Sequence, residues 1–424
     1  MRASLESRLR ERTAEDGVVV PDYDEYCVAN VPETALSLLA DGFERRLPED
    51  VLGDVATDVD NVVVFLLDGF GYEHWKRHRG AHPFLRRLED AGTVAPLTTI
   101  YPSETAAALT TVSTGSVPVE HGLLGWFQYL ESAGRIVETL PFRTLEGDPL
   151  ADVSPSSSAT ELCTGRSIYE RAERAGIDTY AIQPAEFVES GYTRATTAGA
   201  TRVGYDTATD LALSIRRALE VSADPAYVYA YEPTIDAISH AEGTGTERYR
   251  QNLAAVLERL QHELIKRLDP ELAERTLLVV TADHGIVDTA PDENVVMTDW
   301  EAWPSLRETF RRGADGDPRL PTGSPRNVHF HVRPDRLEDA RGIVEANLDG
   351  RTFTREEALE CGLFGPGEPS ALFERRCGEL IAVHRNRGLW WAEMDSIGMH
   401  GGLTDQEMLV PLAAARLDAL RAGR

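Results

Sequence analysis

Acidic and histidine side chains recur in this sequence at or shortly after the ends of short apolar segments. The set is Asp68, Asp236, His240, Asp283, His284 and His400. One Asp and one His four residues apart are common on a helix surface, but three acids and three histidines in similar settings are hard to obtain by chance. Carboxylate oxygen and imidazole nitrogen are the N/O ligands that Zn²⁺ and related cations take in proteins. The set therefore predicts two divalent metal ions.

Thr105 is the candidate nucleophile. It follows Pro102-Ser103-Glu104 and opens a run of Ala, Leu and Thr that contains neither Gly nor Pro before Gly115. The run predicts a helix that begins at or beside Thr105, where free backbone N–H groups and the helix dipole suit a bound phosphoryl group. A threonine at this position is also a common N-cap, so the local sequence leaves both roles open. A bound cation would make its hydroxyl alkoxide-like and reactive.

Alternating strands and helices position these residues. Strands are predicted at Asn61–Asp68, Asp178–Ile182, Ala226–Tyr231 and Thr276–Thr281, and helices at Pro83–Ala91, Gly165–Ala175, Thr207–Val221 and Thr246–Leu268. The continuous apolar character of the strands indicates a parallel sheet buried on both faces. Ligands of such sheets bind at the carboxyl ends of the strands, where Asp68, Asp236 and Asp283 fall. The predicted fold is α/β, with a mostly parallel central sheet flanked by helices.

A small α+β insertion is predicted within this fold. Residues 313–326 are rich in Gly, Pro and Asp, and residues 328–332 alternate apolar and polar side chains as a half-buried strand does. We expect a core domain of residues 1–310 together with 391–424. Residues 311–390 would form the insertion.

The combined motifs resemble the alkaline phosphatase superfamily, particularly its nucleotide pyrophosphatase/type I phosphodiesterase branch. The resemblance covers roughly residues 61–126, 229–243, 277–287 and 398–411. It implies that Thr105 is the nucleophile of the family's Pro-(Ser/Thr)-x-Thr pattern. It also implies one metal held by Asp236, His240 and His400, and another surrounded by Asp68, Asp283, His284 and Thr105.

The resemblance implies a two-metal hydrolase of small phosphoric esters, with phosphodiesters or nucleotide pyrophosphates favoured and a phosphothreonine-type intermediate at Thr105. Zn²⁺ is the expected metal and Mn²⁺ the alternative. A phosphomonoesterase or phosphosugar mutase of the same superfamily stays open, as does a metal-bearing binding module without turnover. A sulfatase is disfavoured because residues 105–108, Thr-Ala-Ala-Ala, lack the Cys/Ser-x-Pro-x-Arg motif of that branch.

The sequence departs from the branch at Trp126. There, an Asn that donates to a phosphoryl oxygen follows a His-Gly-x-x-Gly segment, whereas here His121–Gly125 is followed by Trp126. We assign Trp126 as a candidate substrate-binding residue that stacks on a ring of the substrate. A packed aromatic side chain is the alternative.

The composition is strongly acidic. Asp and Glu number 70 against 43 Lys and Arg, a formal net charge of -27, and Lys76 and Lys266 are the only lysines. Carboxylates keep a surface hydrated in molar salt, which screens their repulsion, so this composition predicts a halophilic protein. It also argues against stable nucleic-acid binding, which needs a basic face.

No segment predicts membrane insertion. The longest apolar run, Val62–Leu67, is far shorter than the roughly 20 residues that span a bilayer. The first residues contain no apolar signal core, which favours a cytoplasmic location. Four scattered cysteines without a C-x-x-C pair are consistent with reduced thiols there. The sequence does not indicate an oligomeric state.

The charge yields a prediction about salt. Unfolding followed by circular dichroism should occur at a markedly lower temperature in dilute buffer than in molar KCl, because unscreened carboxylates repel one another in the compact state. A melting temperature independent of KCl concentration would contradict the halophilic interpretation.

Overall fold

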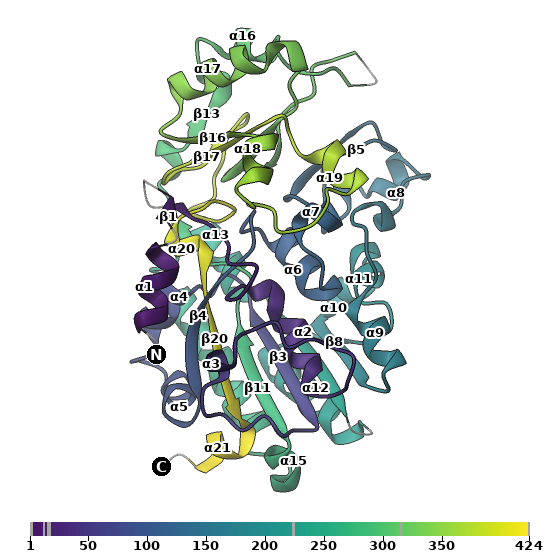
Figure 1. Cartoon of the computed structure of the whole chain (residues 1–424), viewed down its shortest axis with the longest axis vertical. Coiled ribbons are helices and arrows are strands. Elements are labelled where there is room, and N and C mark those ends of the chain that lie inside the picture. The colour runs from purple at the N-terminus through teal and green to yellow at the C-terminus, as the bar shows by residue number, and fades with distance from the viewer. Residues whose placement is uncertain (1–2, 12, 15–17, 223–224, 314–315, 423–424) are drawn as a thin grey trace.

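The computed structural model describes residues 3–11, 13–14, 18–222, 225–313 and 316–422 (Figure 1). Its central sheet has seven strands in the order β4 (Thr93–Thr98), β20 (Leu409–Arg416), β11 (Thr276–Thr281), β3 (Asn61–Leu67), β10 (Ala226–Glu232), β8 (Asp178–Pro184) and β9 (Thr201–Tyr205). Strand β20 runs antiparallel to both of its neighbours, while the other pairs are parallel. This mostly parallel α/β sheet confirms the predicted fold class.

The three strands that precede the candidate ligands lie in register. Asn61 of β3 pairs with Ala226 of β10 and with Thr276 of β11. Every residue of these three strands is buried, as their continuous apolar character predicts. Because the strands start level and run parallel, their carboxyl ends come together at one edge of the sheet. The fold therefore brings chain segments about 50 to 220 residues apart in sequence to one place.

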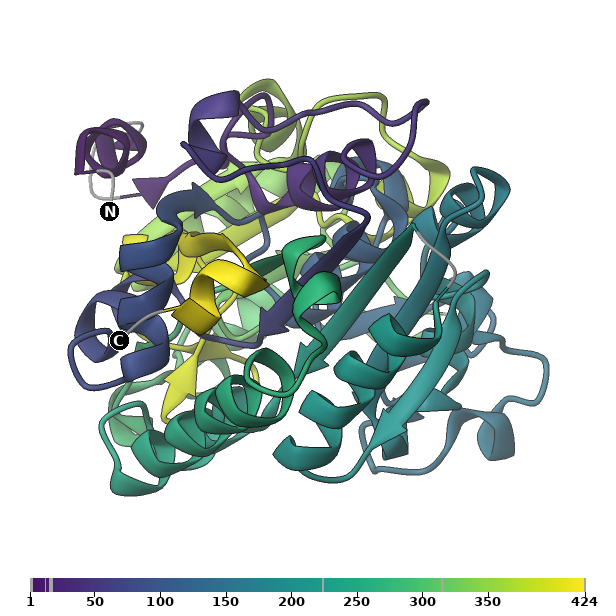
Figure 2. The same cartoon turned by 90° about the horizontal axis from the view of Figure 1, so that it is seen from below.

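Helices cover both faces of the central sheet. Helix α2 (Val31–Ser37) lies on one face, and α12 (Ala208–Val221) and α14 (Glu247–Arg259) lie on the other (Figure 2). The single helix predicted over residues 246–268 is instead α14 followed by the π-helix Leu260–Ile265, in which Lys266 N–H donates to a carbonyl five residues back. Within the described residues, no helix is long and apolar enough to cross a membrane.

A second, antiparallel sheet lies above the first (Figure 1). Its strand order is β16 (Gly350–Thr354), β17 (Leu380–His384), β15 (Asn327–Phe330), β14 (Thr322–Ser324), β5 (Phe127–Leu130), β6 (Arg135–Glu138) and β7 (Arg143–Thr144). It packs around an apolar core of its own, which includes Phe330, Leu380 and Trp390. The sheet thus joins strands of the expected insertion to three strands from residues 127–144. The domain division at residues 311 and 390 stays a prediction.

Candidate metal centre and nucleophile

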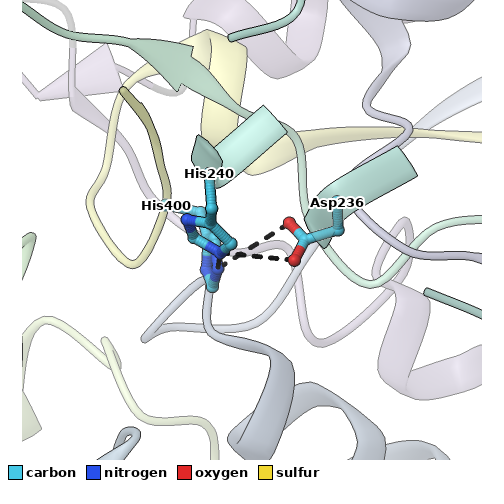
Figure 3. Close-up of side chains that lie close together, drawn as sticks. All are labelled: Asp236, His240 and His400. Carbon is cyan, nitrogen blue, oxygen red and sulfur yellow. Dashed lines mark hydrogen bonds and ion pairs between the residues drawn. The ribbon is translucent and has the colours of Figure 1, made fainter. Parts of the chain in front are cut away.

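The first group of candidate ligands is Asp236, His240 and His400 (Figure 3). Asp236 and His240 lie one turn apart on helix α13 (Thr234–Glu242), which follows β10, with His240 Nε2 3.3 Å from Asp236 Oδ2. His400 follows strand β19 (Gly398–Met399), and its Nε2 lies 3.2 Å from His240 Nε2. One ligand atom from each residue lies within 4.8 Å of those from the other two.

The second group is Asp68, Asp283 and His284, all buried at the ends of β3 and β11. His284 Nε2 lies 3.3 Å from Asp68 Oδ1 and 3.4 Å from Asp283 Oδ2. The two groups are adjacent, because the rings of His284 and His400 stack with their centroids 3.6 Å apart. The structure therefore brings all six sequence-predicted ligands together as two neighbouring sets.

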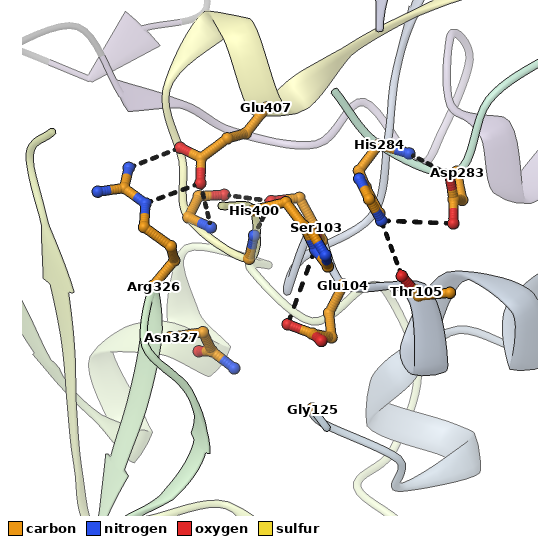
Figure 4. A network of polar contacts seen from close by, with 12 residues as sticks. Ser103, Glu104, Thr105, Gly125, Asp283, His284, Arg326, Asn327, His400 and Glu407 are labelled. Carbon is orange, nitrogen blue, oxygen red and sulfur yellow. Dashed lines mark hydrogen bonds and ion pairs between the residues drawn. The ribbon is translucent and has the colours of Figure 1, made fainter. Parts of the chain in front are cut away.

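Thr105 joins the second group. It is the first residue of helix α6 (Thr105–Thr114), 6% exposed, and its Oγ1 lies 2.9 Å from His284 Nε2 (Figure 4). The N-cap position belongs to Glu104, whose side chain makes no capping hydrogen bond. Thr105 thus occupies the helix start that the sequence predicts, with its hydroxyl directed at a candidate metal ligand.

The three histidines share one orientation. His240 Nδ1 lies 2.7 Å from the carbonyl oxygen of Gly398, His400 Nδ1 lies 3.1 Å from that of Ser103, and His284 Nδ1 lies 3.2 Å from that of Gly285. A carbonyl only accepts, so each Nδ1 carries the proton that it donates. Each Nε2 then faces the carboxylates, and an Nε2 that carries no proton directs its lone pair there, as an imidazole does when it binds a metal.

Each of the three aspartates has one buried carboxylate oxygen that accepts no hydrogen bond. Asp68 accepts a hydrogen bond from the Tyr231 hydroxyl at Oδ2, and Asp283 accepts two backbone N–H groups at Oδ1. Their other oxygens, Asp68 Oδ1 and Asp283 Oδ2, are buried without a hydrogen-bond partner, as is Asp236 Oδ1. Buried acceptors without donors are costly, and oxygen and nitrogen donors of this kind suit a divalent cation. The residues present therefore fit the two metals that the family resemblance implies.

The pKa shifts show how much negative charge is gathered here. Burial, with the nearby carboxyls of Asp283 and Asp236, raises the pKa of Asp68 well above its ordinary value, and burial raises the pKa of Asp283 as well. The Asp236 carboxylate raises the pKa of His240 to about 9. Burial alone would raise the pKa of Asp236, but His240 outweighs it and the pKa is lowered. A cation that binds this pair must therefore displace the His240 proton.

Two glycines let the ligand-bearing segments approach one another. Gly69, directly after Asp68, has φ +70°, a backbone conformation that side chains other than glycine's disfavour. A Cβ on Gly285, directly after His284, would lie 1.9 Å from the carbonyl oxygen of Gln406. The acid–glycine and histidine–glycine pairs in the sequence are therefore required by close packing at the sheet edge.

Residues that the sequence analysis did not assign to the site surround it (Figure 4). Glu104 is 2% exposed, and its Oε2 lies 3.9 Å from His400 Nδ1 without a hydrogen-bond partner. Burial raises the pKa of Glu104 to about 8. Ser103, Arg326 and Glu407 hold the backbone next to His400. Ser103 and Glu104 lie inside the Pro-Ser-x-Thr motif, a signal that could have found them, whereas no local pattern marks Arg326 or Glu407.

Trp126 lies between Gly125 and strand β5 and is partly exposed. Its carbonyl oxygen accepts a hydrogen bond from Thr139 N–H at 2.9 Å. Among the described residues, its indole ring makes no stacking contact with another aromatic ring, unlike neighbouring Phe127, which packs on Trp390. Trp126 is therefore not one of the packed aromatic pairs of the second sheet.

The sequence also matches a known family profile. The profile of type I phosphodiesterase / nucleotide pyrophosphatase matches residues 62–404, which include all six candidate ligands and Thr105. The chain belongs to this family. It is accordingly a metal-dependent hydrolytic enzyme that acts on phosphoesters, as the sequence resemblance implies.

Solved structures share the fold. Murine ectonucleotide pyrophosphatase/phosphodiesterase 5, solved as an inactive variant with AMP, is 14% identical, with 84% of this chain and 88% of that one covered and a TM-score of 0.60. Phosphonoacetate hydrolase from Sinorhizobium meliloti 1021, solved with phosphonoformate, is 18% identical, with 85% and 94% covered and a TM-score of 0.59. Both similarities extend over most of each chain, which confirms the fold.

The site yields a prediction about metal content. Purified protein should carry about two divalent ions per chain by elemental analysis, and Asp283→Ala and His400→Ala should each lose one. Acidification toward and below about pH 6.5, the ordinary histidine pKa, should release metal as the ligands protonate.

His121 provides the control, because it is buried outside both groups and contacts Thr111 Oγ1 at 3.0 Å. His121→Ala should therefore retain both metals. Active enzyme that contains no metal would contradict the assignment.

Proposed function

We propose that this protein is a two-metal hydrolase of small phosphoric esters, with phosphodiesters or nucleotide pyrophosphates as its preferred substrates and Thr105 as its nucleophile. The observation that carries the proposal is the placement of the Thr105 hydroxyl, 2.9 Å from Nε2 of His284, whose ring stacks on that of His400 in the other group. A single hydroxyl thus contacts one of two adjacent N/O ligand sets. We propose Zn²⁺ as the metal, with Mn²⁺ as the alternative.

The residues of the site have distinct tasks in this proposal. Thr105 Oγ attacks phosphorus, the bond to the leaving oxygen breaks, and a phosphothreonine forms; water then cleaves it and restores the threonine. Bound divalent cations would neutralise the charge on the entering and leaving oxygens. The first turn of α6 presents backbone N–H groups without intrahelical partners to the phosphoryl oxygens. The carbonyl contacts of the histidine Nδ1 atoms keep each Nε2 directed into the site.

Charge balance favours diesters over monoesters. Among the described residues, the ion pairs of Asp68, Asp236 and Asp283 involve only histidines, and no arginine or lysine contacts these carboxylates. Two divalent cations would offset the three carboxylates and an ionised Thr105, leaving no surplus positive charge for a dianionic monoester. A diester carries a single negative charge and is bound with less repulsion.

The acidic composition supports a further part of the proposal, which is that the enzyme works in a salt-rich cytoplasm. Its net charge of -27 is suited to a solution in which ions screen surface repulsion. This proposal concerns the setting of the enzyme and does not affect the chemistry at Thr105.

The function is tested by comparing one chromogenic diester with the corresponding monoester in molar salt. We expect a higher kcat/KM for the diester, and Thr105→Ala should lower kcat for it by at least about 10³-fold, because no hydroxyl remains to form the intermediate. Thr105→Ser should retain part of the activity.

Thr114→Ala is the matched control, since Thr114 lies at the other end of α6 with a similar exposure of 7%. It should retain activity. If Thr105→Ala lowered stability and spared turnover, Thr105 would have only a structural role. A preference for the monoester would instead favour the monoesterase interpretation.

Trp126 yields a separate prediction about substrate recognition. If its indole stacks on a substrate ring, Trp126→Ala should raise KM about 5-fold for an aromatic diester, since such stacking contributes about 1 kcal/mol, and should spare a small alkyl diester. Trp303→Ala is the control, because Trp303 packs on Phe310 in the second sheet's core. Unchanged kinetics for both diesters would show that Trp126 does not contact substrate.

A further inference from the structure

The turn between strands β14 and β15 of the second sheet packs against the segment that follows His400. Arg326 lies between strands β14 and β15 and is 0% exposed. Its guanidinium makes a bidentate ion pair with Glu407, with Nε 2.9 Å from Oε1 and Nη2 2.7 Å from Oε2. Nη1 also donates to the carbonyl oxygen of Arg387 at 2.7 Å. A planar guanidinium bound in this way has a fixed orientation.

Glu407 transmits this contact to the segment that carries His400. It lies in helix α20 (Asp405–Met408), is fully buried, and accepts a hydrogen bond from Gly402 N–H at Oε1, 2.9 Å away (Figure 4). Its Oε2 accepts the Thr404 hydroxyl at 2.7 Å. The carboxylate therefore fixes the backbone two residues after His400, and Arg326 fixes the carboxylate.

Ser103 holds the same segment through two further hydrogen bonds. Its Oγ donates to the carbonyl oxygen of Gly402 at 2.7 Å and accepts from Gly401 N–H at 3.1 Å. Gly401 has φ +116°, and a Cβ there would lie 2.7 Å from Ser324 Oγ at the turn that leads to Arg326. Before His400, strand β19 pairs with β12 (Val287–Asp288). Residues 401–402, which follow the ligand, thus depend on Ser103 and on the Arg326–Glu407 pair.

We propose that Arg326 is a positioning residue for the metal site of Asp236, His240 and His400, acting through Glu407 and Gly402. The inference rests on the two-metal function proposed above. Among the described residues, Arg326 makes no hydrogen bond to a candidate ligand, and the Glu407 carboxylate that it holds bonds Gly402 and Thr404. Gly285 N–H, next to His284, bonds the main-chain carbonyl of Glu407, a contact that does not use the carboxylate. Loss of its side chain should therefore affect one metal site and leave the other filled. This selectivity separates positioning from a general contribution to stability.

The test uses full-length protein from which a chelator has removed the metal. Titration with Zn²⁺ in molar KCl, monitored by isothermal calorimetry, then measures the affinity of each site. For Arg326→Met we expect the affinity of one of the two sites to fall about 10- to 100-fold, as when other residues that orient metal ligands are changed. The affected site should be the one that His400→Ala abolishes. Arg326→Lys retains the charge but not the bidentate geometry, so it should show a smaller loss at the same site.

Arg376→Met is the matched control. Arg376 is also buried, at 4% exposure, but donates to the carbonyl oxygens of Gly122, Leu162 and Glu161, which lie outside the His400 segment. It should lower the melting temperature and leave both affinities unchanged. Wild-type affinities in folded Arg326→Met, or equal losses at both sites, would overturn the inference.

If Arg326→Met fails to fold, Arg326→Lys decides, and wild-type affinity at both sites in that variant would overturn the inference. Wild-type protein that binds fewer than two Zn²⁺ ions would instead contradict the proposed function itself. The two failures are therefore distinguishable in one series of titrations.

Discussion

Four carboxyl groups buried in one place constrain everything around this site. Asp68, Asp236, Asp283 and Glu104 are each at most 8% exposed, and among the described residues their ion pairs are formed only with histidines. Removing a carboxylate from water costs several kcal/mol unless an opposite charge compensates it. Two divalent cations would supply that compensation, and the buried carboxyl groups would then stabilise the metal-bound protein.

The fold meets this constraint by placing the ligands on helix α13 and on segments that directly follow strands. Strands β3, β10 and β11 deliver their acids to one sheet edge in register, and the histidines are oriented by hydrogen bonds from Nδ1 to backbone carbonyls. The second sheet completes the arrangement through the Arg326–Glu407 pair. Removing one partner of a buried ion pair is costly, so this contact links the packing of the two sheets to the geometry of the His400 segment.

Much of this arrangement was predictable because it depends on local signals. Strand β11 matches its predicted range, and strand β3 ends at Leu67, one residue before its predicted end. Helix α6 starts at Thr105 as predicted. Buried parallel strands and helix starts have clear sequence patterns. The match of residues 62–404 to the family profile confirms the resemblance to the nucleotide pyrophosphatase/phosphodiesterase branch. The candidate ligands could be grouped from the family pattern, and the structure places the same residues together.

Other features depend on contacts between distant segments and have no local signal. The pairing of Arg326 with Glu407 joins residues 81 positions apart, and the pairing of β5 with β14 through Phe127 and Gly323 joins parts of the chain that the predicted domain boundary separates. The π-helix after Arg259 likewise interrupts an apolar stripe that continues without a break in the sequence. The Pro-Ser-x-Thr motif marks the position of Glu104, but its burial depends on distant residues, since Gly401 and Ser324 of β14 pack beside its carboxyl group.

The most direct test of the account is a crystal structure of the metal-loaded enzyme with anomalous differences measured at the zinc absorption edge. The account predicts two peaks, one bounded by Asp236, His240 and His400 and the other by Asp68, Asp283 and His284, with Thr105 Oγ in contact with the second. A single peak, or peaks that lie away from these residues, would contradict it.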